Sequence, residues 1–562
     1  MIGRPAYQWA VLPAAFVVLL AVGIGLRFHD LGEHFSHVDD LVTIAGPYLI
    51  NQGEPLTVTV PGTGGRLSLA VDAYRIRSNP LLYAAYSTLT TYAPLQFLFY
   101  PLFLNGDFSY REFLWRGRMP SAIFASLALV AFIGLYSAWA GGLDAAGLLG
   151  LGILALSLMN ITYAQQAMSY AVGVLGAALL MWLLVVYANR PTDARRLVWW
   201  AVVCAVLSWA NYQVLMMALI AYAALAVTEY LRHRPQSLKA IVGRYALSAS
   251  FFGVLVMPLF VLLRDKSRPG RLLSIDGFDQ FFPRLPGGGL FDDVTYLLAY
   301  VARALYTVVV TNVTFALDSP AASACVALLF VLFAAGVWGL CVDRHPAALA
   351  LGVFLGLLAV AWAVLNATGR FPLSPTRHVL VLSPIVALVI AIGVRRLGTR
   401  IRPVLGEAVA WTLLVAMVVF FGLGYGQFRT DRADRFDEER LGQLLDAYRL
   451  DTIVGYEWTW NPALMFRRSE RRVTFLDLEP IMRKGAASKA QLPERGFLLV
   501  SQYGPIERYP REHAFLTSQG YAIRPLVSVE SDVQPGVSKA VKWGANGLYV
   551  SVAGKAPAGS AR

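Results

Sequence analysis

Two adjacent carboxylates, Asp39 and Asp40, stand in the segment "GEHFSHVDDLVTIAG", which starts at Gly32 just after the first hydrophobic run of the chain. One carboxylate of such a pair can take a proton from an attacking hydroxyl while the other orients the reactant. Adjacent carboxylates also push each other's pKa apart. The plainer interpretation is a solvated loop charge, or an N-terminal cap for a helix over 41–50. Taken alone, the pair favours the plainer interpretation, so its surroundings must decide.

Four further segments gather tyrosine, amide and basic side chains between apolar runs: "TYAPLQFLFYPLFL" (91–104), "RGRMPS" (116–121), "NITYAQQAMSYAVG" (160–173) and "GRFPLSPTRHV" (369–379). Each has a plainer interpretation when it is considered singly. Arginines snorkel at helix ends, tyrosines form interfacial belts, and glutamines hydrogen-bond between helices. Their order along the chain carries more information than any one of them.

The composition indicates which class of protein carries these segments. The chain of 562 residues is 57% hydrophobic and 15% charged, with a mean hydropathy of +0.55. Soluble globular proteins carry about 25% charged residues. Long apolar runs between sparse charges therefore predict a polytopic α-helical membrane protein. The first run, 9–26, is too long for a signal-peptide core and lacks a small-residue cleavage site, so we expect it to be retained as a span.

The formal net charge is +13 and the isoelectric point about 9.6. Lysine and arginine concentrate in short loops between apolar runs, which membrane topology explains better than nucleic-acid binding. We therefore expect no nucleic-acid partner. The three cysteines, Cys204, Cys325 and Cys341, lie in apolar segments, and we expect no disulfide framework.

Two stretches, 82–104 and 293–316, are long enough to span a bilayer but are rich in Tyr and Thr, and the second contains Arg303. When both are excluded and the N-terminus is inside, every Arg-rich short loop is cytoplasmic, as the positive-inside rule requires. Counting both as spans moves the loops at 190–196 and 232–244 outside. We therefore expect these two stretches to be juxtamembrane or re-entrant elements. About 11 spans remain: 8–26, 119–140, 144–160, 168–189, 197–211, 212–231, 244–263, 321–342, 347–366, 376–394 and 405–425.

The expected organisation is a transmembrane domain over 1–426, with large outer loops at 27–118 and 264–320, followed by an outer domain over 427–550. The C-terminal region is more polar than the rest and contains five short β-like runs separated by helix-like stretches. This pattern predicts a small α/β domain. The last residues, 551–562, are expected to form a disordered tail.

Together the polar segments resemble the lipid-phosphate-dependent membrane glycosyltransferases of the GT-C fold, in particular the protein O-mannosyltransferase and aminoarabinose transferase superfamily. Asp39–Asp40 stands for the acidic pair of that family's first outer loop, and Tyr92–Leu95 stands for its His-Pro-Pro-Leu segment. Arg118–Ser121 matches the Arg-x-Pro-Ser that opens the next span.

The later motifs of that family are matched less closely. Ala164–Tyr170 stands for the amide-rich Ser-Gln-Glu-Ala-Arg-x-Tyr, with Gln166 where the family has Glu and Met168 where it has Arg. Tyr92 likewise replaces the family's His. Arg377–His378 stands for an Arg-Tyr pair at the start of a late span. The resemblance is best over roughly 8–195, weaker over 365–426 and absent from the tail. The lost charges imply a divergent branch with another sugar or acceptor, or a loss of activity.

The resemblance implies an inverting glycosyltransferase in the bacterial cytoplasmic membrane. It would move a hexose or pentose from a polyprenyl (undecaprenyl) phosphate donor to an envelope glycan, lipid or protein acceptor at the outer face. The N-terminus would be cytoplasmic. Asp39 would be the base and Asp40 its partner, with Arg118, Arg377 and His378 on the donor phosphate. The other substrate-binding residues would be Tyr92, Pro94, Gln165, Gln166 and Tyr170.

Relatives of this kind are regarded as metal-independent, and the sequence has no clustered His, Asp and Glu set. We expect no metal or other cofactor, although carboxylates near a phosphate can hold Mg²⁺. The oligosaccharyltransferase signature Trp-Trp-Asp-Tyr-Gly is absent, which argues against transfer of a whole glycan.

Two other functions are compatible with the sequence. A transporter or flippase for a lipid-linked glycan would need ionisable residues deep within several spans, and the sequence shows few. An assembly or sensor protein could use the outer domain to bind a partner, but anchoring alone does not require eleven spans.

Overall fold

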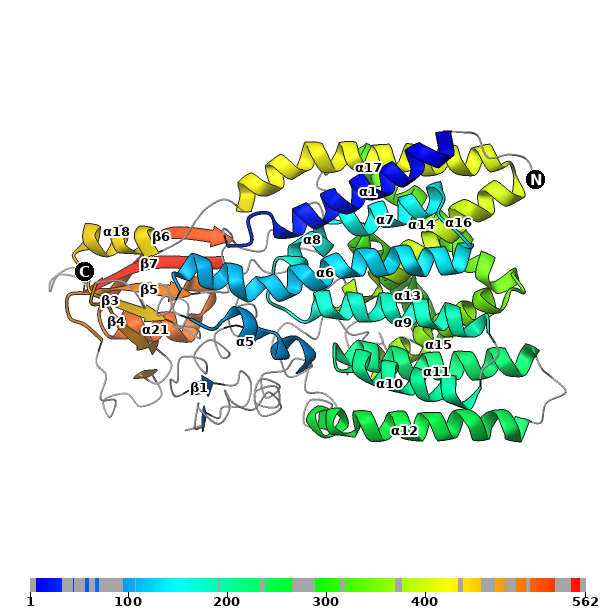
Figure 1. Ribbon diagram of the computed structural model, residues 1–562. Coiled ribbons are helices and arrows are strands. Elements are labelled where there is room, and N and C mark those ends of the chain that lie inside the picture. Colours follow the sequence, from blue (N-terminus) through cyan, green and yellow to red (C-terminus); the bar gives the residue numbers. More distant parts are fainter. Residues whose placement is uncertain are drawn as a thin grey trace.

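The chain forms an elongated bundle of helices with a small α/β domain at one end (Figure 1). The computed structural model describes residues 7–32, 44, 56–59, 66–69, 94–106, 108–190, 193–232, 238–264, 289–313, 319–368, 377–432, 438–455, 471–478, 481–482, 492–501, 506–530 and 547–555. The N-terminal end of α1 and the turn between α16 and α17 lie at the end of the bundle away from the α/β domain. The end of α16 carries Arg395, Arg396 and Arg400, and the turn carries Arg402, so the first helix starts on the side predicted to hold basic loops.

Among the described residues, nine helices are long and apolar enough to cross a membrane. They are α1 (Tyr7–Phe28), α6 (Tyr110–Ala140), α9 (Tyr170–Ala188), α11 (Tyr212–Arg232), α12 (Leu238–Arg264), α14 (Pro320–Val342), α15 (Pro346–Ala367), α16 (Ser383–Arg400) and α17 (Pro403–Arg432). A tenth span is formed if α7 (Ala145–Leu156) and α8 (Leu158–Ala164), which meet at a bend of 52°, count as one. Ten of the eleven predicted spans are thus represented.

The eleventh predicted span, 197–211, contains helix α10 (Ala194–Ser208). Its 15 residues rise about 22 Å, which is less than the hydrocarbon thickness of about 30 Å. Of the two ambiguous stretches, the described part of 82–104 forms the short helices η1 (Pro94–Leu98) and α5 (Tyr100–Phe103). The other overlaps α13 (Leu290–Asn312), a helix of 23 residues, and its juxtamembrane or re-entrant character stays a prediction.

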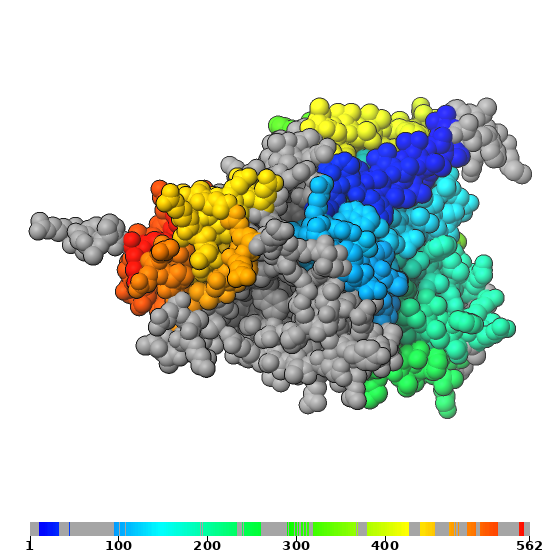
Figure 2. Space-filling view, turned by 60° about the vertical axis from the view of Figure 1, so that its left-hand side comes forward, coloured from blue at the N-terminus to red at the C-terminus, as the bar shows by residue number. Residues whose placement is uncertain are grey.

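The outward faces of the peripheral helices are apolar, as expected for surfaces in lipid. On α1 the exposed residues include Val17 and Val18, and on α17 they include Val415 and Leu423. Helices α1 and α17 lie side by side in both views (Figures 1 and 2), and both contact α7. With ten candidate spans and lipid-type surfaces, the chain is an integral membrane protein.

The break between α7 and α8 has a local cause in the sequence. Asp144 caps α7 by accepting a hydrogen bond from the backbone N–H of Gly147 (3.0 Å). Ser157 interrupts the apolar run with an extended backbone, and its hydroxyl accepts a hydrogen bond from the N–H of Asn160 (3.5 Å), which starts α8. The bend directs α8, and the amide-rich loop after it, toward the end of the bundle that carries the α/β domain.

The α/β domain contains α18 (Glu438–Tyr448), α21 (Pro510–Ser518), the one-turn helix η5 (Ile506–Arg508) and a five-stranded sheet in the order β4-β3-β5-β7-β6. The strands are β3 (Thr452–Gly455), β4 (Thr474–Asp477), β5 (Phe497–Ser501), β6 (Tyr521–Glu530) and β7 (Gly547–Lys555). Strand β3 is parallel to β4 and β5, whereas β7 is antiparallel to β5 and β6. All five β-like runs are therefore strands, and the predicted α/β domain is confirmed.

One boundary in this region was wrong. Residues 551–555 were expected in a disordered tail but form the second half of β7, because they pair with β6, and 551–553 also pair with β5. Residues 556–562 lie outside the described part of the chain.

An exposed ion pair joins α18 to the segment just before β4. Arg471, in that segment, donates hydrogen bonds to the Asp446 carboxylate of α18 and holds the pKa of that carboxyl below its usual value.

The α/β domain touches the bundle through the first residue of α6. Tyr110 packs against a cluster formed by α18 and the central strands, which includes Leu441, Ile453 and Val550. In the first outer loop, β1 (Leu56–Thr59) and β2 (Arg66–Leu69) form an antiparallel pair. The start of α6 therefore links the sheet domain to the end of the bundle where the polar segments meet.

Candidate functional site

Three of the polar segments singled out in the sequence meet in space. Gln96 in η1 donates from Nε2 to the hydroxyl of Tyr100 (2.7 Å) and to the hydroxyl of Ser121 in α6 (2.9 Å). These hydroxyls in turn donate to carbonyl oxygens of the loop after α8, Tyr100 to Ala167 (3.5 Å) and Ser121 to Met168 (3.4 Å). The Pro-rich, Arg-x-Pro-Ser and amide-rich segments are therefore joined by one buried network.

Two predicted site residues hold the end of α1. Arg118 is 1% exposed, and its Nη1 donates to the carbonyl oxygen of Leu31 (2.7 Å). Gln165 is 3% exposed, and its Nε2 donates to the carbonyl oxygens of Leu26 and His29 (2.8 Å each). These contacts fix the chain a few residues before the acidic pair. Asp39 and Asp40 themselves, and Tyr92, lie outside the described residues.

The remaining residues of the amide-rich loop are buried beside this anchor. Gln166 is 4% exposed, and its Oε1 has no hydrogen-bond partner within the described structure. Tyr170 starts α9 and packs edge-on against Tyr163, with ring centroids 5.4 Å apart. Pro94 opens η1, and nothing is described of its side chain.

The late basic pair begins the helix η3 (Arg377–Leu382), whose backbone is described but whose first two side chains are not. This short helix is held by polar residues inside the bundle. Asn312, at the end of α13, donates from Nδ2 to the carbonyl oxygens of Val308 (2.8 Å) and Val379 (3.4 Å). The backbone that carries Arg377 and His378 is thus tied to α13.

A second polar contact joins η3 to α8. The hydroxyl oxygen of Ser383 lies 3.1 Å from Oδ1 of Asn160, 2.6 Å from the carbonyl oxygen of Leu380, and within hydrogen-bond distance of Oδ1 of Asn312. A hydroxyl has one proton and can donate to only one of these acceptors at a time. The cluster links α8, α13 and α16 behind the amide-rich loop.

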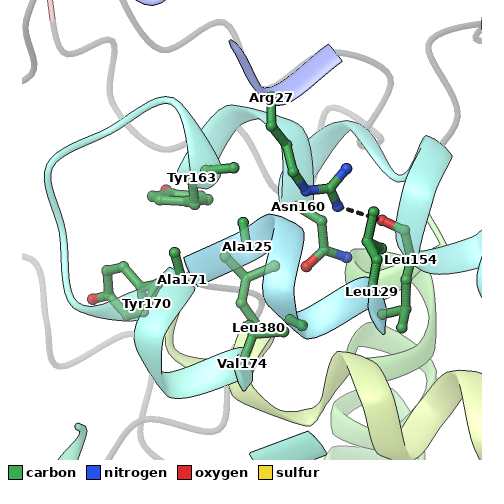
Figure 3. A pocket seen from close by; sticks show the side chains of 12 residues that line it. Arg27, Ala125, Leu129, Leu154, Asn160, Tyr163, Tyr170, Ala171, Val174 and Leu380 are labelled. Atoms are coloured by element: carbon green, nitrogen blue, oxygen red, sulfur yellow. Dashed lines mark hydrogen bonds between the residues drawn. The ribbon is translucent and has the colours of Figure 1, made fainter. Parts of the chain in front are cut away.

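Sequence reasoning missed the cavity that lies next to this cluster (Figure 3). Its polar lining consists of Arg27, Asn160, Tyr163 and Tyr170, and its walls are alanine, leucine and valine side chains of α6, α7, α8, α9 and η3. Arg27 was read only as the first residue after a span, although a cation at the end of an apolar run was a usable signal. Asn160 lay in a quoted segment but had no assigned role.

Electrostatically, this end of the bundle is cationic. In the described part of the helical bundle the buried charged side chains are Arg27 and Arg118, and both lie where α1 ends and α6 begins. Within the ranges that the structure describes, no three His, Cys, Asp or Glu side chains gather as a metal site. The site therefore presents buried guanidinium groups, amides and tyrosines around the base of the segment that carries the acidic pair.

Comparison with known proteins identifies the fold. No protein-family model matches the chain, and no curated protein matches it by sequence. Among solved structures, ArnT from Cupriavidus metallidurans in the apo state is similar over 96% of this chain and 98% of its own, with a TM-score of 0.50 and 11% identity. The same protein bound to undecaprenyl phosphate gives a TM-score of 0.48 at 11% identity, with 97% and 98% covered.

An oligosaccharyltransferase of Archaeoglobus fulgidus, in complex with Zn and sulfate, gives a TM-score of 0.46 at 10% identity over 89% of this chain and 69% of that one. At such identities the likeness shows the fold and not the activity. The likeness to apo ArnT extends over nearly the whole of both chains, so the chain has the GT-C fold expected from its sequence.

Proposed function

We propose that the protein is an inverting glycosyltransferase that moves a sugar from a polyprenyl phosphate donor to an envelope acceptor at the outer face of the bacterial cytoplasmic membrane. The observation that carries the proposal is the anchoring of the chain before Asp39 and Asp40. Arg118 and Gln165, from two segments that resemble glycosyltransferase motifs, both bind the backbone at the end of α1. A general base must be held in a fixed position relative to the reacting hydroxyl, and the anchored backbone before Asp39 supplies such a position.

The lipid donor is proposed on grounds of fold and charge. ArnT, whose apo structure shares this fold, has also been crystallised with undecaprenyl phosphate, which makes a polyprenyl phosphate the first donor class to test. The buried Arg27 and Arg118 suit an anionic lipid that reaches the site from the membrane. A transporter would instead need buried ionisable groups along several spans. In the described part of the bundle the buried charged side chains, Arg27 and Arg118, lie at one end, which favours the transferase.

The proposed step is a single displacement at the anomeric carbon. Asp39 takes the proton of the acceptor hydroxyl as its oxygen bonds to the anomeric carbon, and the bond from that carbon to the phosphate oxygen breaks. The electron pair leaves with the polyprenyl phosphate, and the configuration inverts. Asp40 orients the acceptor. Arg118, Arg377 and His378 stabilise the phosphate charge, and this leaving group needs such stabilisation more than it needs a general acid.

The test is sugar transfer by the purified protein in liposomes, with a panel of polyprenyl-phosphate sugars and envelope extract as acceptor. Asp39→Asn is expected to lower turnover by about 10²–10⁴-fold, the usual contribution of a general base. A variant that melts at the wild-type temperature shows that the fold is kept. Wild-type turnover with full activity in Asp39→Asn and Asp40→Asn would remove the assigned base. No turnover of any donor by the wild type would favour the transporter.

A further inference from the structure

The cavity beside Arg27 has room for part of a ligand. About 20 Å³ of it is open to the centre of a water molecule, which is enough for one or two oxygen atoms but not for a sugar ring. Figure 3 shows the side chains of Arg27 and Asn160 directed into this space, with Tyr163 and Tyr170 on one side. The apolar walls include Ala125, Leu129 and Val174. A cavity of this kind suits one charged oxygen next to hydrocarbon.

Arg27 carries a buried charge that the protein neutralises only in part. Its side chain is 2% exposed, and its Nη1 and Nη2 donate to the carbonyl oxygens of Gly23 (2.6 Å), Leu154 (2.8 Å) and Ala155 (3.4 Å). The last two carbonyls belong to the final turn of α7, which is the negative end of that helix. No carboxylate of the described residues forms an ion pair with Arg27, and its Nε has no hydrogen-bond partner among them. A buried cation of this kind is stabilised by an anion.

Asn160 adds a second unmatched donor to the same cavity. It is 8% exposed, and its Oδ1 faces Ser383 while its Nδ2 lacks a partner within the described ranges. Two residues that each carry an N–H donor without an acceptor, one of them cationic, therefore line one small space. An oxyanion oxygen suits such a space, because it carries several lone pairs and negative charge.

We infer that this cavity is a phosphate-type oxyanion subsite in which Arg27 and Asn160 bind one oxygen of the ligand. The rest of the phosphate group stays at the mouth, since the cavity is too small to hold it. The alanine and leucine walls favour a lipid-borne phosphate over free phosphate. That identification rests on the proposed function, whereas the oxyanion chemistry does not.

The test measures binding alone, without sugar donor or acceptor, so that a failure of the proposed transfer reaction does not decide it. The full-length protein in detergent is titrated with geranylgeranyl phosphate, geranylgeraniol and inorganic phosphate, and binding is followed by calorimetry and by the rise in melting temperature. Arg27→Gln is expected to bind geranylgeranyl phosphate about tenfold more weakly or worse, with little change for the alcohol. Arg395→Gln is the matched control. Arg395 also donates to a helix-end carbonyl, that of Ala140 (2.9 Å), but it does not line this cavity.

Arg27→Gln could unfold because it also loses bonds to α7, so Asn160→Asp provides a second test. This variant keeps the side-chain size and places a carboxylate beside Arg27, which should repel phosphate without loss of stability. Weaker phosphate binding in either folded variant, with Arg395→Gln unchanged, supports the subsite. Competition by inorganic phosphate at similar concentrations would assign free phosphate as the ligand. Wild-type affinity in both folded variants, or equal binding of alcohol and phosphate by the wild type, would overturn the inference and leave a cavity that holds only water.

Discussion

The guanidinium of Arg118 donates a 2.7 Å hydrogen bond to the carbonyl oxygen of Leu31, 87 residues earlier in the chain. Arg118 belongs to the Arg-x-Pro-Ser segment, whereas Leu31 is the eighth residue before Asp39. The contact means that α6 sets the position of the chain that leads to the acidic pair. Arg118 can therefore support the reaction through the backbone as well as through a phosphate, and the two roles can be separated by mutation.

Arg118→Gln is expected to lower sugar transfer by roughly tenfold or more. A hydrogen bond from a charged group is worth about 1.5–3 kcal/mol, and each 1.36 kcal/mol of barrier changes the rate about tenfold. The turnover number and the KM for the donor are measured separately. A lower turnover number at constant donor KM indicates anchoring, because the segment with Asp39 is then misplaced. A higher donor KM indicates phosphate binding.

The control is Arg116→Gln, two residues away on the same helix. Arg116 pairs with Glu112 on the exposed face (2.9 Å), and such surface pairs contribute little. This variant should transfer sugar like the wild type. If Arg116→Gln and Arg118→Gln lost the same activity, the effect would come from general damage to α6, and the anchoring role would be refuted.

Gln165 and Gln166 are adjacent but should respond differently to replacement by leucine. Gln165→Leu removes two hydrogen bonds and leaves the carbonyls of Leu26 and His29 without them, which should cost about 1–3 kcal/mol of stability and most of the transfer activity. Gln166→Leu removes an acceptor, Oε1, that has no partner in the described structure, so it should keep its melting temperature. Melting in detergent and transfer rates are compared for both.

For Gln166, the informative result is activity. If it binds substrate, Gln166→Leu loses transfer at unchanged stability, whereas Gln166→Glu, which introduces the residue type of the motif that this segment resembles, should shift donor or acceptor preference. Full activity of Gln166→Leu with every donor would show that this glutamine is not part of the substrate site.

The bundle itself could be predicted because long apolar runs report membrane spans directly. The five strands of the C-terminal domain were also predictable, since short runs rich in β-branched residues, such as Thr452–Gly455, stand between polar stretches. The order β4-β3-β5-β7-β6 was not, because it depends on contacts between distant parts of the chain. The break at Ser157 escaped because a single serine within an apolar run does not by itself predict a bend, and because Arg27, far away in sequence, binds the carbonyls on its α7 side.

The site could be predicted as a set of segments but not as a set of roles. The order of the motifs correctly grouped Ser121 with the amide-rich loop, and Gln96 joined them without being singled out. The resemblance to a known motif suggested that Arg118 binds a phosphate. In the structure Arg118 binds a backbone carbonyl, and the phosphate role stays a prediction. A guanidinium suits both partners, so only tertiary structure distinguishes them.

Glycines at the contact between α14 and α16 should be intolerant of any side chain. A Cβ added at Gly336 would overlap the carbonyl oxygen of Val389, and one added at Gly393 would overlap that of Leu332. Both obstacles are backbone atoms, so the helices must separate. Gly336→Ala and Gly393→Ala are each expected to destabilise the protein by about 1–3 kcal/mol. Gly356→Ala in α15, where a Cβ would meet nothing within 4 Å, is the control and should melt at the wild-type temperature or slightly above.

The polar cluster behind η3 should control the late basic pair. Asn312→Leu removes the side-chain bonds to Val308 and Val379, and Ser383→Ala removes the hydroxyl between α8 and α13. Because η3 carries Arg377 and His378, both variants should raise the donor KM by several-fold, and Arg377→Gln should add little on top of Asn312→Leu. Ser208→Ala is the matched control, since this buried hydroxyl donates to Cys204 of its own helix (2.7 Å). Additive losses in the double variant would mean that Asn312 stabilises the bundle without positioning Arg377.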